Sequence, residues 1–161
     1  MSKIFIGIDN GVTATVGIVG DTQPVMVKLP TKKEQNYTKK KDNITRLDAK
    51  GFADLISGYD PSEVMIVMER PMVNPTRFKA TTSALRCFEA ELTLIEHFGF
   101  AHCYVDSKDW QKVMLPKGVS GEDLKKASLD IGNRLFPQFR DFKHPDRDGI
   151  LIAEFARRAN L

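Results

Sequence analysis

Two short apolar runs, residues 4–8 and 64–68, each end in a carboxylate, at Asp9 and Glu69. Short runs rich in isoleucine, valine and methionine are typical of buried strands. An acid at the tip of such a strand is poorly placed for packing and well placed to bind a cation. If the two strands are parallel neighbours, both acids emerge at the edge of the sheet where α/β proteins bind ligands. The sequence therefore predicts a sheet with an acidic edge.

Two further acids, Asp146 and Asp148, come just before the apolar residues 150–152 of the last predicted helix. Helical spacing places Asp148 on the same face as Ile152, and we expect this face to lie against the sheet. Several carboxylates gathered at one point are the usual setting for phosphodiester chemistry with divalent metal ions. His144 in the preceding loop is a candidate base or ligand, or simply an exposed loop histidine.

Each of these acids also has an ordinary structural interpretation. Asp9 precedes an Asn-Gly pair and could be a turn residue, and Glu69 could form a surface ion pair. Asp146 is an N-cap candidate for the final helix, and Asp148 would suit the positive end of that helix. The joint pattern is harder to explain in these terms than any single acid.

The remaining patterns predict a mixed α/β fold. A two-residue hairpin turn at Asn10-Gly11 would return the chain as a second strand at 13–19, and residues 25–29 alternate as a third. The strand at 64–68 follows a helix and should lie parallel to the first. The other expected elements are a mobile irregular loop at 31–46, a helix from Asp48 to Gly58, a long helix at 76–98, a strand at 102–105, a short helix capped by Ser107, and helices at 122–136 and 147–159. We therefore predict a five-stranded mixed sheet, three antiparallel strands followed by two parallel ones, with helices on both faces.

Composition excludes several classes of protein. A chain of 161 residues with 42% apolar residues can build one domain over residues 1–161, and no apolar run approaches a membrane span. Two cysteines outside any metal or redox spacing, and no visible secretory signal, favour a cytoplasmic protein. The net charge is only +3, but residues 32–46 and 70–86 are strongly basic. Acids within basic surroundings suit a polyanionic substrate, although a lysine-rich stretch can also be solvated surface.

The chain resembles the RuvC-type Holliday junction resolvases of the ribonuclease H-like superfamily, specifically their compact phage-borne branch. The resemblance runs in a consistent order through most of the chain. It is carried by the segments 6–11 (IGIDNG), 68–75 (MERPMVNP), 83–86 (SALR), 107–112 (SKDWQK), 124–128 (LKKAS) and 146–154 (DRDGILIAE). Each motif is weak alone, and the whole set is fairly specific.

This resemblance implies a ribonuclease H-like fold and a homodimeric endonuclease that cuts four-way (Holliday) junctions and other branched DNA. It also implies dependence on Mg²⁺ or Mn²⁺, with two ions in each active site. Asp9 matches the acid of the family's first strand, Glu69 that of its fourth strand, and Asp148 that of its final helix. The protein would then act in the cytoplasm, which is that of a bacterial host if a phage encodes it.

One position departs from the family pattern. The family usually has a further acid or histidine three residues before the last acid, where this chain has Pro145. Asp146 or His144 must take that place, and we favour Asp146. The predicted catalytic and metal-binding residues are therefore Asp9, Glu69, Asp146 and Asp148.

The resemblance also assigns residues to DNA binding. The segment 71–78 would help to open the junction, with Met72 and Phe78 as apolar wedges, although Phe78 could instead pack in the core. Contacts to phosphates are expected from the basic residues Arg77, Lys79, Lys108, Lys112, Lys117 and Lys125. The long helix at 76–98 is our candidate for the dimer interface, although its apolar stripe also suits the sheet.

Other functions are compatible with parts of this pattern. One is a non-catalytic protein that binds branched DNA on the same fold, and another is a ribonuclease H-like nuclease acting on RNA or replication forks. The actin-like ATPases and sugar kinases also open with a Gly-Ile-Asp-x-Gly pattern. They need two such domains, for which 161 residues leave no room.

Overall fold

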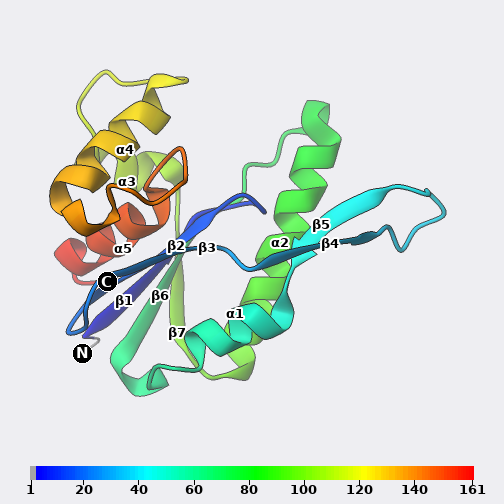
Figure 1. The fold of residues 1–161 in the computed structure, drawn as a ribbon, viewed down its shortest axis with the longest axis horizontal. Coiled ribbons are helices and arrows are strands. Elements are labelled where there is room, and N and C mark those ends of the chain that lie inside the picture. The colour runs from blue at the N-terminus through cyan, green and yellow to red at the C-terminus, as the bar shows by residue number, and fades with distance from the viewer. Residues whose placement is uncertain (1–2) are drawn as a thin grey trace.

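A computed structural model describes residues 3–161 and contains a central five-stranded sheet (Figure 1). The strands are β1 (Ile4–Ile8), β2 (Thr15–Gly20), β3 (Val25–Lys28), β6 (Val64–Glu69) and β7 (Ala101–Val105). They lie in the order β3-β2-β1-β6-β7. β2 is antiparallel to β1 and β3, whereas β6 is parallel to β1 and β7. The predicted mixed sheet is confirmed.

Helices cover both faces of the sheet, also as predicted (Figure 1). One face is covered by α1 (Ala49–Ile56) and α2 (Phe78–His97), and the other by α3 (Ser107–Met114), α4 (Asp123–Leu135) and α5 (Asp148–Ala159). Short 3-10 turns occupy Pro61–Glu63, Pro75–Arg77 and Pro137–Phe139. Within residues 3–161, no helix has the length and apolar character needed to cross a membrane.

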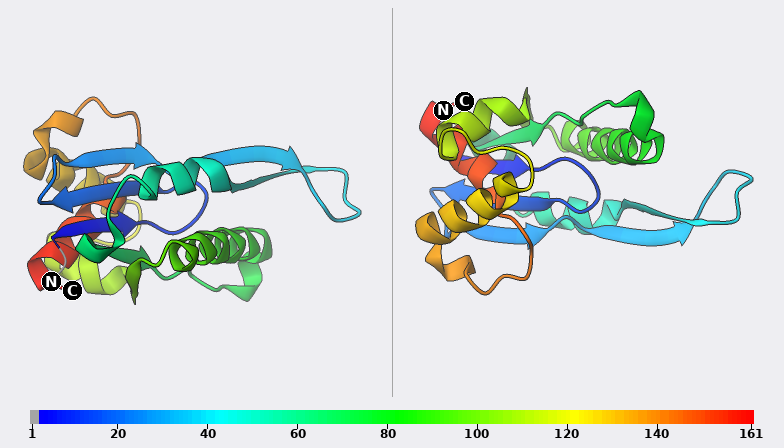
Figure 2. Two further views of the ribbon diagram at one scale, coloured as in Figure 1. Left: turned by 90° about the horizontal axis from the view of Figure 1, so that it is seen from below. Right: turned by 90° about the horizontal axis from the view of Figure 1, so that it is seen from above.

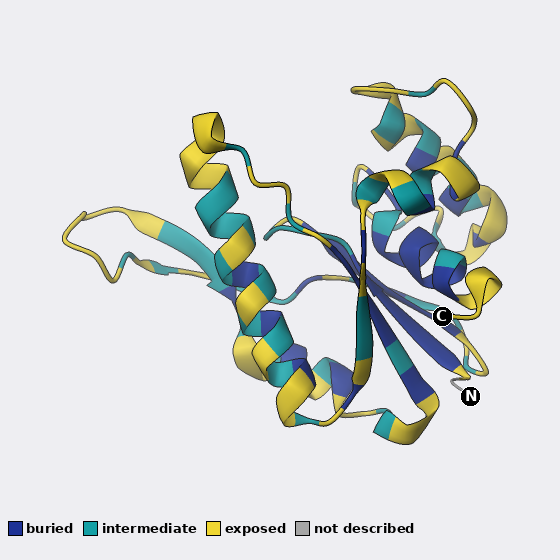
Figure 3. Ribbon diagram, turned by 180° about the vertical axis from the view of Figure 1, so that it is seen from behind, coloured by how far each residue is buried: buried dark blue, intermediate teal, exposed yellow. Residues whose placement is uncertain are grey.

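The alternation of side chains along β1 divides the core into two layers. Ile4, Ile6 and Ile8 pack with α1 and α2, whereas Phe5 packs with α3 and α5. Successive strand residues point to opposite faces, so a strand covered on both sides is apolar throughout. Figure 3 shows the buried central strands between helices whose outer faces are exposed.

α5 packs directly on the backbone of β1 and β2 because glycines line the contact. A Cβ atom on Gly7 would lie 2.3 Å from the backbone nitrogen of Ala153, and one on Gly17 would lie 2.1 Å from the Cα of Ile150. Gly149, Ile150 and Ala153 of α5 make this contact, whereas helical spacing predicted the face of Asp148 and Ile152. The small residues decide the contact face because they let the two backbones come together.

The predicted two-residue turn at Asn10-Gly11 is wrong. Residues 9–14 form a longer loop, and β2 begins only at Thr15. The amide of Asn10 donates to its neighbour Asp9, and its side chain donates to Glu69. Asn10 is therefore turned toward the acidic edge of the sheet and does not form the hairpin turn that its pairing with glycine suggests.

The predicted irregular loop at 31–46 is also wrong. This segment forms β4 (Thr31–Gln35) and β5 (Asn43–Leu47), an antiparallel hairpin that projects beyond the main sheet (Figures 1 and 2). The backbone ladder joins the two strands, and Glu34 pairs with Arg46 across the hairpin at 2.8 Å. Both strands are largely polar, so the apolar alternation that identifies a half-buried strand is absent from the sequence.

Two helix ends follow the local sequence signals, and a third is shifted by one residue. Asp48 caps α1 by accepting from the amide of Gly51, and Gly99 follows α2 with a positive φ of 76°, both as expected. The cap of α3 is Asp106 and not the predicted Ser107, because Asp106 forms a capping box with Asp109.

Candidate metal centre and active site

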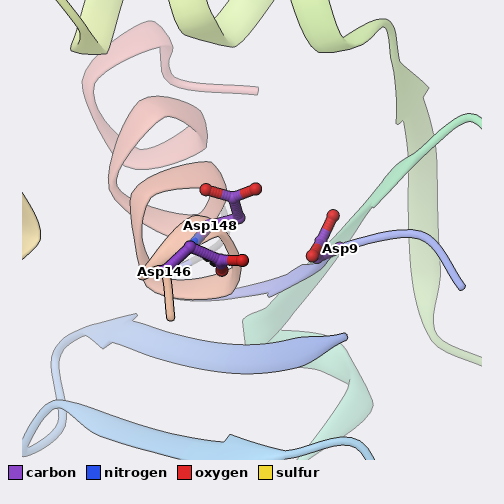
Figure 4. A group of neighbouring side chains, drawn as sticks. All are labelled: Asp9, Asp146 and Asp148. Atoms are coloured by element: carbon purple, nitrogen blue, oxygen red, sulfur yellow. Dashed lines mark hydrogen bonds between the residues drawn. The ribbon is translucent and has the colours of Figure 1, made fainter. Parts of the chain in front are cut away.

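Three aspartates meet at one end of the sheet (Figure 4). Asp9 follows β1, Asp146 lies in the loop before α5, and Asp148 is the first residue of that helix. One carboxylate oxygen from each lies within 4.8 Å of the other two. They line an open cavity of about 940 Å³, together with Glu69, Lys125 and residues of the loop before α5. Parts of the chain far apart in sequence thus supply one acidic site.

The electrostatics of this cluster favour a bound cation. Burial, followed by the charge of Asp146, raises the pKa of Asp148 to about 7. Burial and the neighbouring carboxylates, first of all that of Asp148, raise the pKa of Asp9 well above its ordinary range. No lysine or arginine among residues 3–161 forms an ion pair with the three aspartates. The charge of Lys125 lowers the pKa of Asp148 only as a minor influence, and His144 lies 3.5 Å from Asp146. Several hard oxygen ligands with raised pKa values fit a divalent cation such as Mg²⁺ or Mn²⁺.

Glu69 lies beside this cluster, at the end of β6, and is 4% exposed. The indole Nε1 of Trp110 donates to its Oε2 at 2.5 Å, and Asn10 donates to its other oxygen. Burial raises the pKa of Glu69, while the bonds from Trp110 and Asn10 oppose this shift. The carboxylate is oriented by neutral donors next to Asp9, and its role as a metal ligand stays a prediction.

His144 links the loop before α5 to the loop after β1. Its Nε2 donates to the carbonyl oxygen of Thr13 at 2.8 Å, and its Nδ1 lies 3.3 Å from the amide nitrogen of Asp146. The same Nδ1 lies 3.5 Å from Oδ1 of Asp146, so the histidine positions both the loop and this carboxylate. Asp146, in contrast, points into the cluster, so the geometry favours Asp146 at the position left open by Pro145.

Arg147 is a site residue that the sequence did not identify. It is 1% exposed between the two aspartates. Its guanidinium makes five hydrogen bonds at 2.8 to 3.1 Å, to the side chain of Asn133 and to the carbonyl oxygens of Phe139, Phe142, His144 and Asp146. The arginine thereby ties down the loop that carries Asp146. A lone arginine in sequence normally indicates a surface residue, so no local signal marks this role.

Ser128 of α4 supports the same segment from the other side. Its hydroxyl donates to Oδ1 of Asp148 at 2.5 Å and accepts from the amide of Arg147 at 2.9 Å. The side chain of Asp146 also accepts from the amide of Asp148 at 3.1 Å, so it satisfies the start of α5 as well as facing the cluster. The N-cap position of α5 is Arg147 and not the predicted Asp146. The bond from Asp146 to the first amide of the helix is nevertheless compatible with its proposed role as a ligand.

The residues predicted to bind DNA lie in three places around the site. Met72, in the segment before α2, is 72% exposed, and Phe78, the first residue of α2, is 73% exposed. The alternative in which Phe78 packs in the core is therefore wrong. Arg77 and Lys79 are exposed beside Phe78. A shallow pocket is lined by Lys108, Lys112 and Lys117, whereas Lys125 lines the acidic cavity itself. Their contacts with DNA stay predictions.

Comparisons with known proteins bear on the fold. No protein family profile matches the chain, and no curated protein matches its sequence. Among solved structures, Thermus thermophilus RuvC in complex with a Holliday junction substrate is similar, with a TM-score of 0.58, 12% identity, and coverage of 97% of this chain and 95% of that one. Another T. thermophilus RuvC structure has a TM-score of 0.58, 10% identity, and coverage of 98% and 96%. This chain therefore has a RuvC-like ribonuclease H fold.

Proposed function

We propose that this protein is a metal-dependent endonuclease that cleaves phosphodiester bonds in four-way junctions and other branched DNA. The observation that carries the proposal is the meeting of Asp9, Asp146 and Asp148 at the end of the sheet in a RuvC-like fold. The three carboxylates, with Glu69 beside them, offer the oxygen ligands that two divalent cations require. When bound, these cations would lower the pKa of water and neutralise charge on the phosphate.

The surrounding residues would keep the carboxylates of this site in position. Arg147 and His144 tie the loop that carries Asp146 to its neighbours through backbone oxygens. Ser128 orients Asp148 from α4. Lys125 lines the same cavity without a carboxylate partner among the described residues, so its ammonium is available to a substrate phosphate.

The substrate proposal extends the likeness to RuvC, whose solved complex contains a Holliday junction substrate. Met72 and Phe78 are exposed apolar side chains near the start of α2, where they can insert between unstacked bases. The basic residues around them suit a polyanion. We propose that these two wedges open the junction while Lys108, Lys112 and Lys117 bind phosphates.

We also propose that the protein is a homodimer, because a four-way junction presents two symmetric strands for cleavage. α2 and β7 expose Leu85 and Tyr104, which are 42% and 38% accessible, and the ring of Phe88 lies 5.5 Å from that of Tyr104. This is an exposed apolar area that a second copy could cover. Light scattering should give the mass of a dimer for the wild type and that of a monomer for Leu85→Asp.

The test of the proposed activity is digestion of a synthetic four-way junction with an immobile crossover. Mg²⁺ or Mn²⁺ should support paired cuts near the crossover, and duplex DNA of the same sequence should stay intact. Asp9→Asn should bind the junction without cutting it, whereas Asp54→Asn, an exposed acid on α1, should cut like the wild type.

Two other outcomes of this digestion would favour a different function. Tight binding without cleavage in any divalent metal would indicate a non-catalytic junction-binding protein. Faster cleavage of forks or RNA–DNA hybrids than of four-way junctions would indicate a different substrate for the same chemistry.

A further inference from the structure

A second basic surface lies outside the acidic cavity, between the β4–β5 hairpin and the first half of α2. We call it the hairpin groove, and it has a volume of about 650 Å³. Tyr37, Lys39 and Lys40 line it from the hairpin, and Lys79 and Arg86 line it from α2. Figure 2 shows the hairpin and α2 projecting side by side, with the loop after β1 between their bases.

The charge of the hairpin groove is strongly unbalanced. Four basic side chains line it, against the single acid Asp42, whose Oδ1 already accepts from the side chain of Asn36 at 2.9 Å. Within residues 3–161, none of the four basic side chains forms an ion pair. The other acid of the hairpin, Glu34, is paired with Lys32 and Arg46. This unbalanced positive charge favours the binding of a polyanion in the hairpin groove.

The ring of Tyr37 contacts two arginine side chains, one of which lines the groove. The guanidinium carbons of Arg46 and Arg86 lie 5.8 Å and 6.0 Å from the centre of its ring, so both cations are held at the ring. Nε of Arg86 is also buried without a hydrogen-bond partner in the described part of the chain. A buried donor without a partner is rare in folded proteins, and negative charge in the groove would stabilise the charge of this guanidinium.

The hairpin groove leads away from the acidic cavity. Val12, in the loop after β1, lines both the cavity and the groove, and Thr31, the first residue of β4, lines the cavity. A strand that crosses the three aspartates can thus continue into the groove without leaving the protein surface. This continuity favours the substrate itself over an unrelated anion.

We infer that the hairpin groove binds the sugar–phosphate backbone of a DNA arm that leaves the active site. This inference rests on the proposed function, and adds a contact surface separate from Lys108, Lys112 and Lys117. Of the basic residues in the groove, only Lys79 is among the phosphate contacts that the sequence predicted. Lys39, Lys40, Lys79 and Arg86 bind phosphates of the arm, and Tyr37 keeps the arginine in place. Such contacts are independent of base sequence and sensitive to salt.

The experiment compares two double variants that remove the same charge. Lys39→Gln with Lys40→Gln alters the hairpin groove, whereas Lys3→Gln with Lys50→Gln removes two exposed lysines away from it. Fluorescence anisotropy measures binding of a four-way junction over a range of salt concentrations, with Ca²⁺ in place of Mg²⁺. The hairpin double variant should lower the slope of log Kd against log salt by about 2, since each lost phosphate contact removes about 1. The control should keep the slope of the wild type.

Two further measurements complete the test, the kinetics of junction cleavage and the mass of the protein in solution. The hairpin variant should raise KM and leave kcat unchanged, because the groove is remote from the three aspartates. Equal salt slopes for both double variants would overturn the inference even if the wild type cuts junctions. A change of mass in light scattering would overturn it too, and would assign the groove to contact between copies of the chain. A wild type that binds junctions without cutting them, with the expected loss of slope, would support the groove and reject the nuclease activity.

Discussion

Asp9 and Asp148, which lie near opposite ends of the sequence, face each other with carboxylate oxygens within 4.8 Å. The close contact of α5 with β1 produces this arrangement, because glycines at the contact bring the start of the helix to the end of the strand. Two carboxylates at this distance repel each other in a buried site. This repulsion therefore lowers the stability of the metal-free protein, and a bound cation would relieve it.

Asp148→Asn should stabilise the protein without metal at neutral and alkaline pH. The pKa of Asp148 in the folded protein is about 7, against 3.8 for an ordinary aspartate. Because the pKa of this carboxyl group is higher in the folded than in the unfolded protein, the group contributes most stability below about pH 4. That contribution is lost as the pH rises to about 7. At pH 8 the variant should melt roughly 4 to 8 °C above the wild type, equivalent to about 2 kcal/mol, and near pH 4 the two should melt alike.

The same melting temperatures should be measured again with Mg²⁺ present. Mg²⁺ should raise the melting temperature of the wild type at pH 8 and have a smaller effect on Asp148→Asn. Asp54→Asn, the exposed control, should respond like the wild type. If Asp148→Asn melted below the wild type at pH 8, the repulsion between the carboxylates would not be the dominant effect.

Asp146→Asn separates the two roles of this residue. Asparagine keeps an oxygen that can accept from the amide of Asp148, a bond of 3.1 Å in the wild type, but it lacks the negative charge. We expect cleavage of junctions to fall by at least roughly 100-fold with little change in melting temperature. Full activity in this variant would show that Asp146 serves only to support the start of α5.

Arg147→Lys should destabilise the protein by about 3 to 5 kcal/mol, as measured by urea unfolding. Lysine keeps the charge but cannot satisfy the side chain of Asn133 and four carbonyl oxygens with one ammonium. The matched control is Arg134→Lys, an exposed arginine paired with Asp130 at 3.1 Å, which should change stability by less than about 0.5 kcal/mol. Equal effects in the two variants would remove Arg147 from its supporting role.

Glu91→Gln should reduce the pH dependence of stability. Glu91 is 2% exposed in the middle of α2, and burial raises its pKa to about 8 from 4.5. The protonated form is stable in the core, so the stability contributed by this group is lost as the pH rises from about 4.5 to about 8. The variant should exceed the wild type by on the order of 2–4 kcal/mol at pH 8 and match it near pH 4. Glu89→Gln, an exposed change on the same helix, should retain the pH dependence of the wild type.

Local patterns in the sequence predicted most of the framework. The apolar runs of β1 and β6 identified the two central strands, because strands covered on both faces need apolar residues at every position. Asp48 and Gly99 marked helix ends, because capping depends on the residue itself and its nearest neighbours. These features depend on short-range chemistry and so can be recognised without knowing the fold.

The β4–β5 hairpin escaped prediction because its strands are stabilised by cross-strand pairs such as Glu34 with Arg46 and have little apolar alternation. The turn at Asn10 was mispredicted for the opposite reason. Its sequence favours a tight hairpin, but the side chain is engaged by Glu69, a residue of another strand. Local preference gave way to a tertiary hydrogen bond at the site.

The sequence by itself determined the five strands of the main sheet, the helices between them, and the identity of the acids at their ends. Only the tertiary structure decided that Asp9, Asp146 and Asp148 share one cluster, because that depends on how closely α5 approaches β1. It also decided the supporting roles of His144 and Arg147, most of whose partners are backbone oxygens. Every residue carries such an oxygen, so no pattern of side chains in the sequence reveals which of them a histidine or an arginine will bind.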